Sequence, residues 1–303
     1  MTLTLPSFAK INWTLEIMGK RPDGYHEIRT LLQTVSLADD LSFELLEKGI
    51  EIICDHPEIP CDETNLVFRA AKLLGDWAGV KKGVRVTINK RIPTAAGLGG
   101  GSSNAAVTVI ALLRLWEIKL PIKDLFTLGA KLGADVPFFF MGGTCLGVGR
   151  GDEVYPLADT NVDNLLLVNA GILVSTREVY ANLPPELTKP HTITKMPLSL
   201  EAAYAGITTQ NERIRLHNDL EIPVLARQPL ISELKEILRQ TGATGTLMSG
   251  SGSTVFAVFE NDAARSLARR ELSRHGWWCD SVRTLGRDEY QAIYQQALAN
   301  VMA

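Results

Sequence analysis

The sequence lacks three features that would assign it at once to a class of protein: an excess of one charge, paired cysteines and a long apolar run. The net charge of −3 gives no basic surface for nucleic acid or for an anionic membrane. The four cysteines include no Cys-x-x-Cys pair, which argues against the usual zinc and dithiol motifs and indicates a reducing compartment. The longest apolar candidate, residues 136–148, is interrupted by glycine and threonine and is too short to span a bilayer.

Targeting signals and the best-known nucleotide-site signatures are also missing. The first six residues have neither the charged nor the apolar region of a signal peptide. Together with the scattered cysteines and the small net charge, this predicts a cytoplasmic protein without nucleic-acid or membrane partners. No Gly-Lys-Ser/Thr closes a Walker A loop, and no complete dinucleotide fingerprint is present. No His-Arg-Asp or Asp-Phe-Gly occurs, which excludes an ordinary protein kinase. The sequence does not indicate an oligomeric state.

The length and the element pattern predict two domains. A chain of 303 residues with 46% apolar and 21% charged residues can build an ample soluble core. The composition changes near Tyr155-Pro156, so we place an N-terminal domain at 1–155 and a C-terminal domain at 156–303. Helical and strand patterns are mixed without strict alternation, which predicts an α+β fold with a ligand cleft between the domains.

Apolar periodicity and turn residues set the expected elements. Strands are expected at 11–18, 40–46, 84–89, 164–169 and 254–259, with turns at 21–24 and 245–252 and a loop at 183–198. Helices are expected at 65–77, about 103–117, 122–132, 230–238, 263–274 and 290–303, and a capping box at 175–178 begins one more. Residues 138–148 look like a buried helix or strand pair around two glycines.

A glycine-rich loop between an expected strand and an expected helix is the strongest functional signal. Four of the five residues at 97–101 are glycine, and two serines follow. Glycine lets the backbone approach an anion closely, and the following helix N-terminus adds partial positive charge. A mobile linker is the alternative, but the apolar residues of the loop argue against it. The residues expected to line a nucleotide phosphate site are Pro93, Thr94, Ala95, Ala96, Gly97, Leu98, Gly99, Gly100, Gly101, Ser102, Ser103 and Asn104.

Two titratable residues are candidates for the chemistry of phosphoryl transfer, and each has a plain structural alternative. Lys10 lies where an expected strand starts and should face away from Ala9 and Ile11; alone, it would be a solvent-facing lysine. Asp135 precedes Val136-Pro137, so it is a helix N-cap at least as readily as a catalytic base. If Lys10 lies beside Asp135, an ion pair would keep the carboxylate charged and oriented.

Two further segments suit a ligand. In the turn Arg21–His26, Tyr25 and His26 offer an aromatic face and a hydrogen-bonding ring, a combination that suits a planar heterocycle. A single tyrosine–histidine pair in a loop usually has no such role. The glycine-serine segment Met248–Thr254 is either a plain connection or a second anion site, and its sequence does not decide between them.

Taken together, three segments resemble the motifs of the galactokinase, homoserine kinase, mevalonate kinase and phosphomevalonate kinase (GHMP) superfamily. Pro6–Asn12, Pro93–Ala105 and Met248–Thr254 are similar to its first, second and third motifs, in the same order and across nearly the whole chain. The resemblance implies a ribosomal protein S5-type N-terminal domain and a ferredoxin-like C-terminal domain. It also implies that the glycine loop holds ATP with Mg²⁺, which Ser102 or Ser103 could reach, although no metal-binding residue is assigned.

Within the superfamily, the turn Arg21–His26 and the segment Leu132–Pro137 resemble the kinases of 4-diphosphocytidyl-2-C-methyl-D-erythritol. That resemblance implies ATP-dependent phosphorylation of the 2-hydroxyl of this cytidine diphosphate compound, in the non-mevalonate route to isoprenoid precursors. It implies that Asp135 is the base and that Lys10 assists it. The implied substrate-binding residues are Asn12, Tyr25, His26, Thr176 and Tyr180, and the implied residues near the adenine nucleotide are Asn65, Lys90 and Asn104.

Two alternatives remain beside this assignment. The first is another small-molecule kinase of the superfamily, for mevalonate or homoserine, in which Tyr25 and His26 would be dispensable. The second is a catalytically dead relative that only binds nucleotide, which the presence of both Lys10 and Asp135 disfavours.

Overall fold

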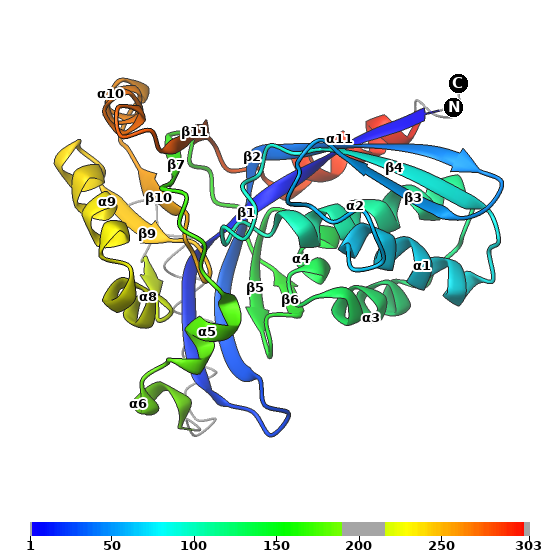
Figure 1. The fold of residues 1–303 in the computed structure, drawn as a ribbon, viewed down its shortest axis with the longest axis horizontal. Coiled ribbons are helices and arrows are strands. Elements are labelled where there is room, and N and C mark those ends of the chain that lie inside the picture. Colours follow the sequence, from blue (N-terminus) through cyan, green and yellow to red (C-terminus); the bar gives the residue numbers. More distant parts are fainter. Residues whose placement is uncertain (1, 190–215, 300–303) are drawn as a thin grey trace.

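A computed structural model describes residues 2–189 and 216–299 and shows two sheets, each covered by helices (Figure 1). The first sheet has seven strands and the second has four. Helices and strands are mixed within both halves, which confirms the α+β prediction. None of the helices within the described ranges is long and apolar enough to cross a membrane.

A long antiparallel hairpin forms the middle of the first sheet, and the turn of this hairpin is the outermost part of that sheet. Strands β1 (Thr2–Lys20) and β2 (His26–Leu46) are both longer than the sequence pattern predicts, because bulges let each strand change which face is buried. The predicted turn between them is present, and Gly24 takes a positive φ of 87° there. Lys10 therefore lies in the middle of a strand and not at its start.

The other strands of the first sheet come from distant parts of the chain. The order is β3-β4-β2-β1-β8, and β5 pairs with both β2 and β6. The bounds are β3 (Ile50–Cys54), β4 (Gly83–Asn89), β5 (Thr144–Val148), β6 (Glu153–Pro156) and β8 (His217–Asn218). Since β8 follows the second sheet's first strand in sequence, the two halves of the chain are interleaved at this edge.

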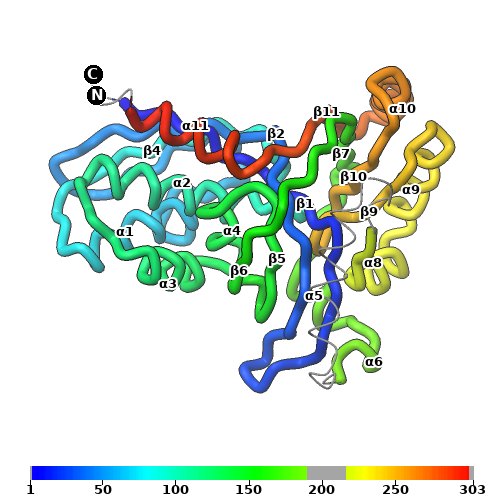
Figure 2. The backbone as a smooth tube through the Cα atoms, turned by 180° about the vertical axis from the view of Figure 1, so that it is seen from behind, coloured from blue at the N-terminus to red at the C-terminus, as the bar shows by residue number. Residues whose placement is uncertain are grey.

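Four helices pack beside the first sheet, and the last helix of the chain packs at the start of β1 (Figures 1 and 2). The four are α1 (Leu66–Ala78), α2 (Gly100–Leu115), α3 (Ile122–Leu132) and α4 (Val136–Met141). Helix α11 (Arg287–Ala299) places Tyr290 and Tyr294 in the same apolar core. Their hydroxyls donate hydrogen bonds to the carbonyls of Phe139, at 2.6 Å, and Pro6, at 2.9 Å.

The second sheet is antiparallel throughout, in the order β11-β7-β10-β9. Its strands are β7 (Leu165–Asn169), β9 (Gly245–Met248), β10 (Val255–Val258) and β11 (Trp278–Val282). The helices on its side of the molecule are α8 (Glu221–Arg227), α9 (Pro229–Gln240) and α10 (Asp262–Ser273), while α5 (Thr176–Ala181) and α6 (Pro185–Thr188) lie beside the β1–β2 hairpin. A separate apolar core joins the two sheets, where the Trp13 ring of β1 meets the Phe256 ring of β10 edge to face.

Most predicted elements are present, and the differences have local causes. Helix α2 begins at Gly100, three residues before the predicted start, because the loop glycines form its first turn. Residues 245–248 are a strand and not part of a turn, since they pair with β10. The predicted loop at 183–198 contains the short helix α6, and its residues from 190 onward lie outside the described ranges. Strands β3, β6, β8 and β11 and helix α8 were not among the expected elements. The domain boundary at 155 stays a prediction.

Candidate active site

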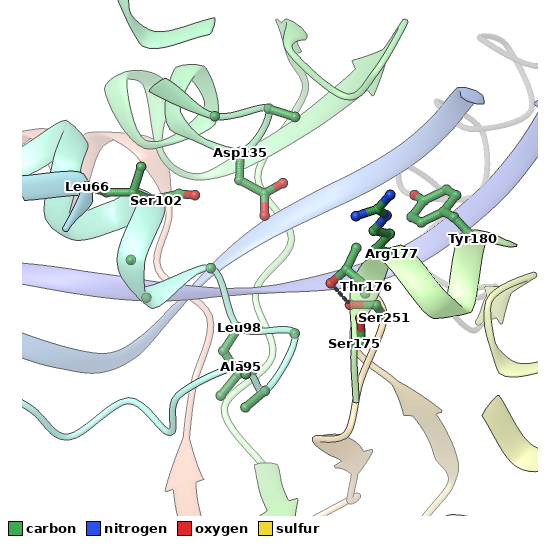
Figure 3. A pocket seen from close by; sticks show the side chains of 18 of the residues that line it. Leu66, Ala95, Leu98, Ser102, Asp135, Ser175, Thr176, Arg177, Tyr180 and Ser251 are labelled. Atoms are coloured by element: carbon green, nitrogen blue, oxygen red, sulfur yellow. Dashed lines mark hydrogen bonds between the residues drawn. The ribbon is translucent and has the colours of Figure 1, made fainter. Parts of the chain in front are cut away.

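A cleft of about 1460 Å³ collects nearly all the candidate residues. It is bounded by the glycine loop, the β1–β2 hairpin, the start of α4, helix α5 and the segment that follows β9 (Figure 3). In both overall views α5 and α6 lie beside the lower part of the hairpin. Tyr25 of the hairpin turn and Tyr180 of α5 both line the cleft.

Lys10 and Asp135 meet in this cleft. The Lys10 Nζ lies 3.6 Å from Asp135 Oδ2, and the exposed fractions of the two side chains are 5% and 35%. Ala9 and Ile11 point into the core between the sheets, as the alternation of the strand predicts. The alternative of a solvent-facing lysine is therefore wrong, while the more accessible Asp135 carboxylate can still be reached from the cleft.

The backbone conformation at Asp135 shows that this residue is not simply a helix N-cap. Asp135 immediately precedes α4, but its own backbone is helical, with φ −79° and ψ −13°, and its side chain makes no capping hydrogen bond. The carboxylate points into the cleft instead (Figure 3). An N-cap side chain normally accepts a hydrogen bond from a backbone N–H of the first turn. The position of Asp135 thus leaves its oxygens available to a ligand.

Asn12 holds Lys10 in place. Its Oδ1 accepts a hydrogen bond of 2.7 Å from Lys10 Nζ, and its Nδ2 donates one of 2.7 Å to Thr30 Oγ1. Thr30 in turn donates to the Thr14 carbonyl at 2.6 Å. Asn12 lines the cleft, but both ends of its amide are already engaged within the protein. The contacts present in the structure are those of a residue that orients Lys10.

The glycine loop has the backbone geometry of an anion-binding loop. Ala95, Gly97 and Gly99 have positive φ values of 48°, 77° and 70°. Gly99 is the N-cap of α2, so the first N–H groups of that helix have no partner within it. A positive φ at alternate residues turns successive N–H groups toward one side, which forms a concave anion site. The left-handed Ala95 is a strained conformation of the kind that occurs at functional sites.

The loop carbonyls face the other way and are held by neighbouring segments. Lys10 N donates to the Leu98 carbonyl at 3.0 Å, and Ser249 Oγ donates to the Gly97 carbonyl at 3.0 Å. Thr254 N donates to the Ala96 carbonyl at 3.2 Å. A Cβ on Gly97 would lie 2.0 Å from the Ser249 carbonyl oxygen. The segment Met248–Thr254 therefore supports the glycine loop directly, a contact that its sequence did not reveal.

The two loop serines differ in their surroundings. Ser102 lines the cleft. Ser103 is fully buried, and its hydroxyl accepts a 2.7 Å hydrogen bond from Ser7. Asn104 lines the cleft and donates to Ser7 Oγ at 2.9 Å. Of the two hydroxyls, only that of Ser102 faces the space where a ligand would lie.

Lys90 and Asn65 also line the cleft, and each has a structural contact. Lys90 is paired with the buried Asp39. Asn65 is the N-cap of α1: its Oδ1 accepts from Val67 N at 2.9 Å, and its Nδ2 donates to the Pro60 carbonyl at 2.6 Å. A Cβ built on Gly100 would lie 3.3 Å from Lys90 Nζ, and one built on Gly101 would lie 3.6 Å from Leu66, the residue after Asn65, so both residues lie beside the glycine loop.

The aromatic residues form two pairs at the hairpin end of the cleft. The His26 and Tyr180 rings lie 5.1 Å apart between centroids, tilted by 33°. Tyr25 is 58% exposed, and the Arg150 guanidinium lies 5.2 Å from its ring centroid. Burial, and then the charge of Lys20, lower the pKa of His26. Burial, and then the nearby Asp135 carboxylate, raise the pKa of Tyr180, so both rings are neutral at pH 7.

Several residues of the site carried no motif signal. Thr176 was predicted, but its partner was not: its hydroxyl shares a 2.7 Å hydrogen bond with Ser251 (Figure 3). Arg150 and Arg177 line the cleft and were missed, because isolated arginines in loops and short helices are common. Asn218 was also missed; it does not line the cleft but supports the segment after β9, since its amide donates to the carbonyls of Met248 and Gly250, both at 2.8 Å. Only the folded contacts reveal these roles.

Within residues 2–189 and 216–299, no group of three or more His, Cys, Asp or Glu side chains could hold a metal ion. A hard cation such as Mg²⁺ does not require such a group, since it usually keeps waters and binds through one or two protein oxygens and substrate phosphates. Ser102 and Asp135 both face the cleft beside the glycine loop and offer such oxygens (Figure 3). The donor set fits a cation carried by a nucleotide.

Comparison with known proteins agrees with the geometry. Residues 65–143 match the N-terminal domain of GHMP kinases and residues 206–276 match the C-terminal domain. The 4-diphosphocytidyl-2-C-methyl-D-erythritol kinase of Syntrophus aciditrophicus is 43% identical over 91% of this chain and 96% of its own length. The kinase of the same name from Citrifermentans bemidjiense is 43% identical over 93% of this chain and 99% of its own.

Solved structures give the same result. A crystal structure of 4-(cytidine 5′-diphospho)-2C-methyl-D-erythritol kinase superposes with a TM-score of 0.78 at 35% identity, covering 94% of this chain and 100% of its own. Homoserine kinase from Cytophaga hutchinsonii shares the fold, with a TM-score of 0.69 at 19% identity over 95% of this chain and 96% of its own. The chain therefore belongs to the GHMP kinases and, among them, to the family of 4-diphosphocytidyl-2-C-methyl-D-erythritol kinases.

Proposed function

We propose that this protein transfers the γ-phosphate of ATP to the 2-hydroxyl of 4-diphosphocytidyl-2-C-methyl-D-erythritol, a step toward isoprenoid precursors by the non-mevalonate route. The observation that carries the proposal is the position of Asp135 and Lys10. They face one cleft that contains the glycine loop and the His26–Tyr180 pair. The four cysteines are unpaired, which fits the cytoplasmic location that forms part of the proposal.

Asp135 acts as the base in this reaction. One carboxylate oxygen accepts the proton of the substrate's 2-hydroxyl while that hydroxyl oxygen attacks the γ-phosphorus, and the bond from phosphorus to the β–γ bridging oxygen breaks, leaving ADP. The Lys10 ammonium, 3.6 Å from the carboxylate, stabilises its orientation and adds positive charge beside the transferred group. Asn12 fixes the ammonium through the 2.7 Å hydrogen bond to its Oδ1.

The glycine loop binds the triphosphate. Its positive-φ residues and the free N–H groups at the start of α2 supply donors and partial positive charge. Lys90, Asn65 and Asn104 also line the cleft, and we assign them to the adenine nucleotide. When bound, Mg²⁺ neutralises negative charge on the phosphates, and Ser102 is the loop hydroxyl that would face it. Support for Mg²⁺ comes from the donor set, which suits a cation delivered with ATP.

The hairpin end of the cleft binds the cytidine. Tyr25 and Tyr180 stack on the base, and the neutral His26 forms hydrogen bonds with its polar edge. Asn12 and Thr176 also line the cleft, and we assign them to the polar groups of the substrate. Support comes from the neighbouring His26 and Tyr180 rings and from the exposure of the Tyr25 ring, which is accessible to a ligand.

A direct assay tests the proposal against its alternatives. The purified protein should consume ATP only when the cytidine diphosphate substrate is present, and the product should carry one additional phosphate. Turnover of mevalonate or homoserine, with none of the cytidine substrate, would assign the protein to another GHMP reaction. ATP binding without turnover of any of the three substrates would identify a catalytically dead relative.

Tyr25→Ala is expected to raise the KM for the cytidine substrate about ten- to a hundredfold, because stacking on an aromatic side chain contributes about 1–3 kcal/mol per base. The KM for ATP should hardly change, since Tyr25 lies at the opposite end of the cleft from the glycine loop. Steady-state kinetics with each substrate varied in turn measures both constants. Tyr25 is 58% exposed, so the substitution should leave folding intact.

Tyr155→Ala is the matched control for this variant. Tyr155 is 52% exposed on β6 and does not line the cleft. It should leave both KM values unchanged. If Tyr25→Ala instead weakened ATP and spared the cytidine substrate, the hairpin would belong to the nucleotide donor site, and the cytidine assignment would be lost while a general kinase function survived.

His26 should make substrate binding depend on pH. Burial lowers the pKa of His26 below its ordinary value of 6.5, so the neutral ring is the binding form at pH 7. As the pH falls through this lowered pKa, protonation removes the ring's acceptor, and the KM for the cytidine substrate should rise. His26→Ala should abolish this acid limb and reduce the preference for cytidine over uridine analogues. An acid limb of the same size in the variant would show that another group is responsible.

A further inference from the structure

The buried carboxylate of Asp39, behind the cleft, accepts hydrogen bonds from residues at both ends of the glycine loop. Asp39 lies on β2, and none of its side chain is exposed. Its Oδ1 accepts hydrogen bonds from the backbone N–H groups of Arg91, at 2.8 Å, and Ile92, at 2.9 Å. Its Oδ2 accepts from the Lys90 ammonium and, at 3.0 Å, from the Asn104 side-chain amide. Lys90 and Asn104 both line the cleft.

The register of the sheet explains how one side chain reaches these groups. Strands β2 and β4 pair as far as Asp40 and Asn89, so Asp39 stands one residue beyond the last pair. There its carboxylate takes the place of a strand partner for the N–H groups of Arg91 and Ile92. β4 ends at Asn89, and the chain turns toward the glycine loop. The carboxylate thus fixes where the loop begins.

The far end of the loop is tied to the same carboxylate. Asn104 lies near the start of α2, and besides its bond to Asp39 it donates to Ser7 Oγ at 2.9 Å. The Ser7 hydroxyl donates to Ser103 Oγ at 2.7 Å. Residues 90–92 before the loop and residues 103–104 after it therefore share one buried network, which sets the separation of the loop's two anchors.

Lys90 links this network to the loop itself. A Cβ built on Gly100 would lie 3.3 Å from Lys90 Nζ, so the ammonium sits against the first turn of α2. A lysine side chain has a flexible four-carbon stem, and its charge is directed only when a partner holds it. Asp39 is that partner, and the Lys90 side chain is only 5% exposed.

We propose that Asp39 is a positioning residue for ATP, which holds the Lys90 ammonium and both anchors of the glycine loop in the arrangement that binds the triphosphate. Asp39 does not touch the nucleotide, since it is fully buried. The inference rests on the proposed kinase function and identifies a residue that sets the affinity of its ATP site. A preorganised site loses less conformational freedom on binding. Loss of Asp39 should therefore weaken ATP binding, with little effect on binding of the other substrate.

Asp39→Asn tests this directly. The asparagine has one acceptor oxygen in place of two, so it cannot accept from all four donors, and it leaves Lys90 without its charged partner. ATP affinity by calorimetry and the KM for ATP should weaken about ten- to a hundredfold, a range typical of a misplaced binding group. The KM for the cytidine substrate should change less than about twofold, within the scatter expected for a site that is not coupled to the change.

Asp159→Asn is the matched control. Asp159 also joins separate segments by accepting from backbone N–H groups, those of Thr144 at 3.0 Å and Arg287 at 2.6 Å, and it does not line the cleft. This variant should lower the melting temperature and leave both KM values unchanged. If it weakened ATP binding as much as Asp39→Asn does, the effect would reflect general loss of stability, and the inference would be overturned.

Asp39→Glu covers the case in which Asp39→Asn does not fold. It keeps a negative charge beside Lys90 but displaces the carboxylate by one methylene, so it should fold and still weaken ATP binding. Wild-type ATP affinity in this variant would overturn the inference. Calorimetry with ATP alone needs no acceptor substrate. A wild-type protein that binds ATP but does not phosphorylate the cytidine substrate would therefore refute the proposed function and leave the test of Asp39 valid.

Discussion

Asp135→Asn is expected to lower kcat by about a hundredfold or more while both substrates still bind, because a positioned general base contributes at least that much. The amide has nearly the shape of the carboxylate but cannot accept the proton of the attacking hydroxyl. Folding should be preserved, since Asp135 makes no capping hydrogen bond and Lys10 keeps its 2.7 Å contact with Asn12. Steady-state kinetics, calorimetry with each substrate and the melting temperature together measure the effect.

Asp124→Asn is the control for the loss of a negative charge near a helix start. Asp124 lies in the first turn of α3, the helix before α4, and does not line the cleft. It should change stability by at most about 1 kcal/mol and leave kcat unaltered. If Asp135→Asn lowered the melting temperature by several degrees and retained kcat, Asp135 would serve the helix end and not the reaction.

The sequence predicts the glycine loop and the helices well because their signals are local. Apolar periodicity places α1 and α3 within a residue or two, and four glycines in five positions mark the loop. Strand β9 was missed because its pairing with β10 is decided by contacts along the sheet. Strand β11 was missed for a related reason: it is half-buried without clear alternation and is held by β7.

In the candidate site, too, a local sequence signal identifies some residues, and only contacts between distant segments reveal the others. Lys10 and Asp135 were both found, but whether Asp135 is a cap or a base depended on where its side chain points. Asp39 belongs to an ordinary strand pattern, and only the register of β2 against β4 places it at the end of the loop. A buried network of this kind has no sequence spacing of its own, because its members lie on four separate segments of the chain.

Gly99→Val is expected to weaken ATP binding by at least about a hundredfold, because small displacements of a binding group have effects of that order. Gly99 is the N-cap of α2 with a φ of 70°, a conformation that a β-branched residue rarely adopts. A Cβ there would lie 3.0 Å from both Lys10 Cγ and Phe139 Cζ. The loop would have to move away from Lys10 and from the position that suits the triphosphate. Calorimetric titration with ATP measures the change.

Gly79→Val separates backbone strain from loss of the ligand site. Gly79 ends α1 with a φ of 66°, close to that of Gly99, but no atom lies within 4 Å of a Cβ built there, and it does not line the cleft. This control should destabilise the protein by about 1–2 kcal/mol, the usual strain of a left-handed non-glycine residue, and bind ATP normally. Unchanged ATP affinity in Gly99→Val would remove the phosphate-binding role of the loop. If both variants lost ATP affinity equally, backbone strain alone would explain the effect, because the two glycines share a conformation and differ in their neighbours.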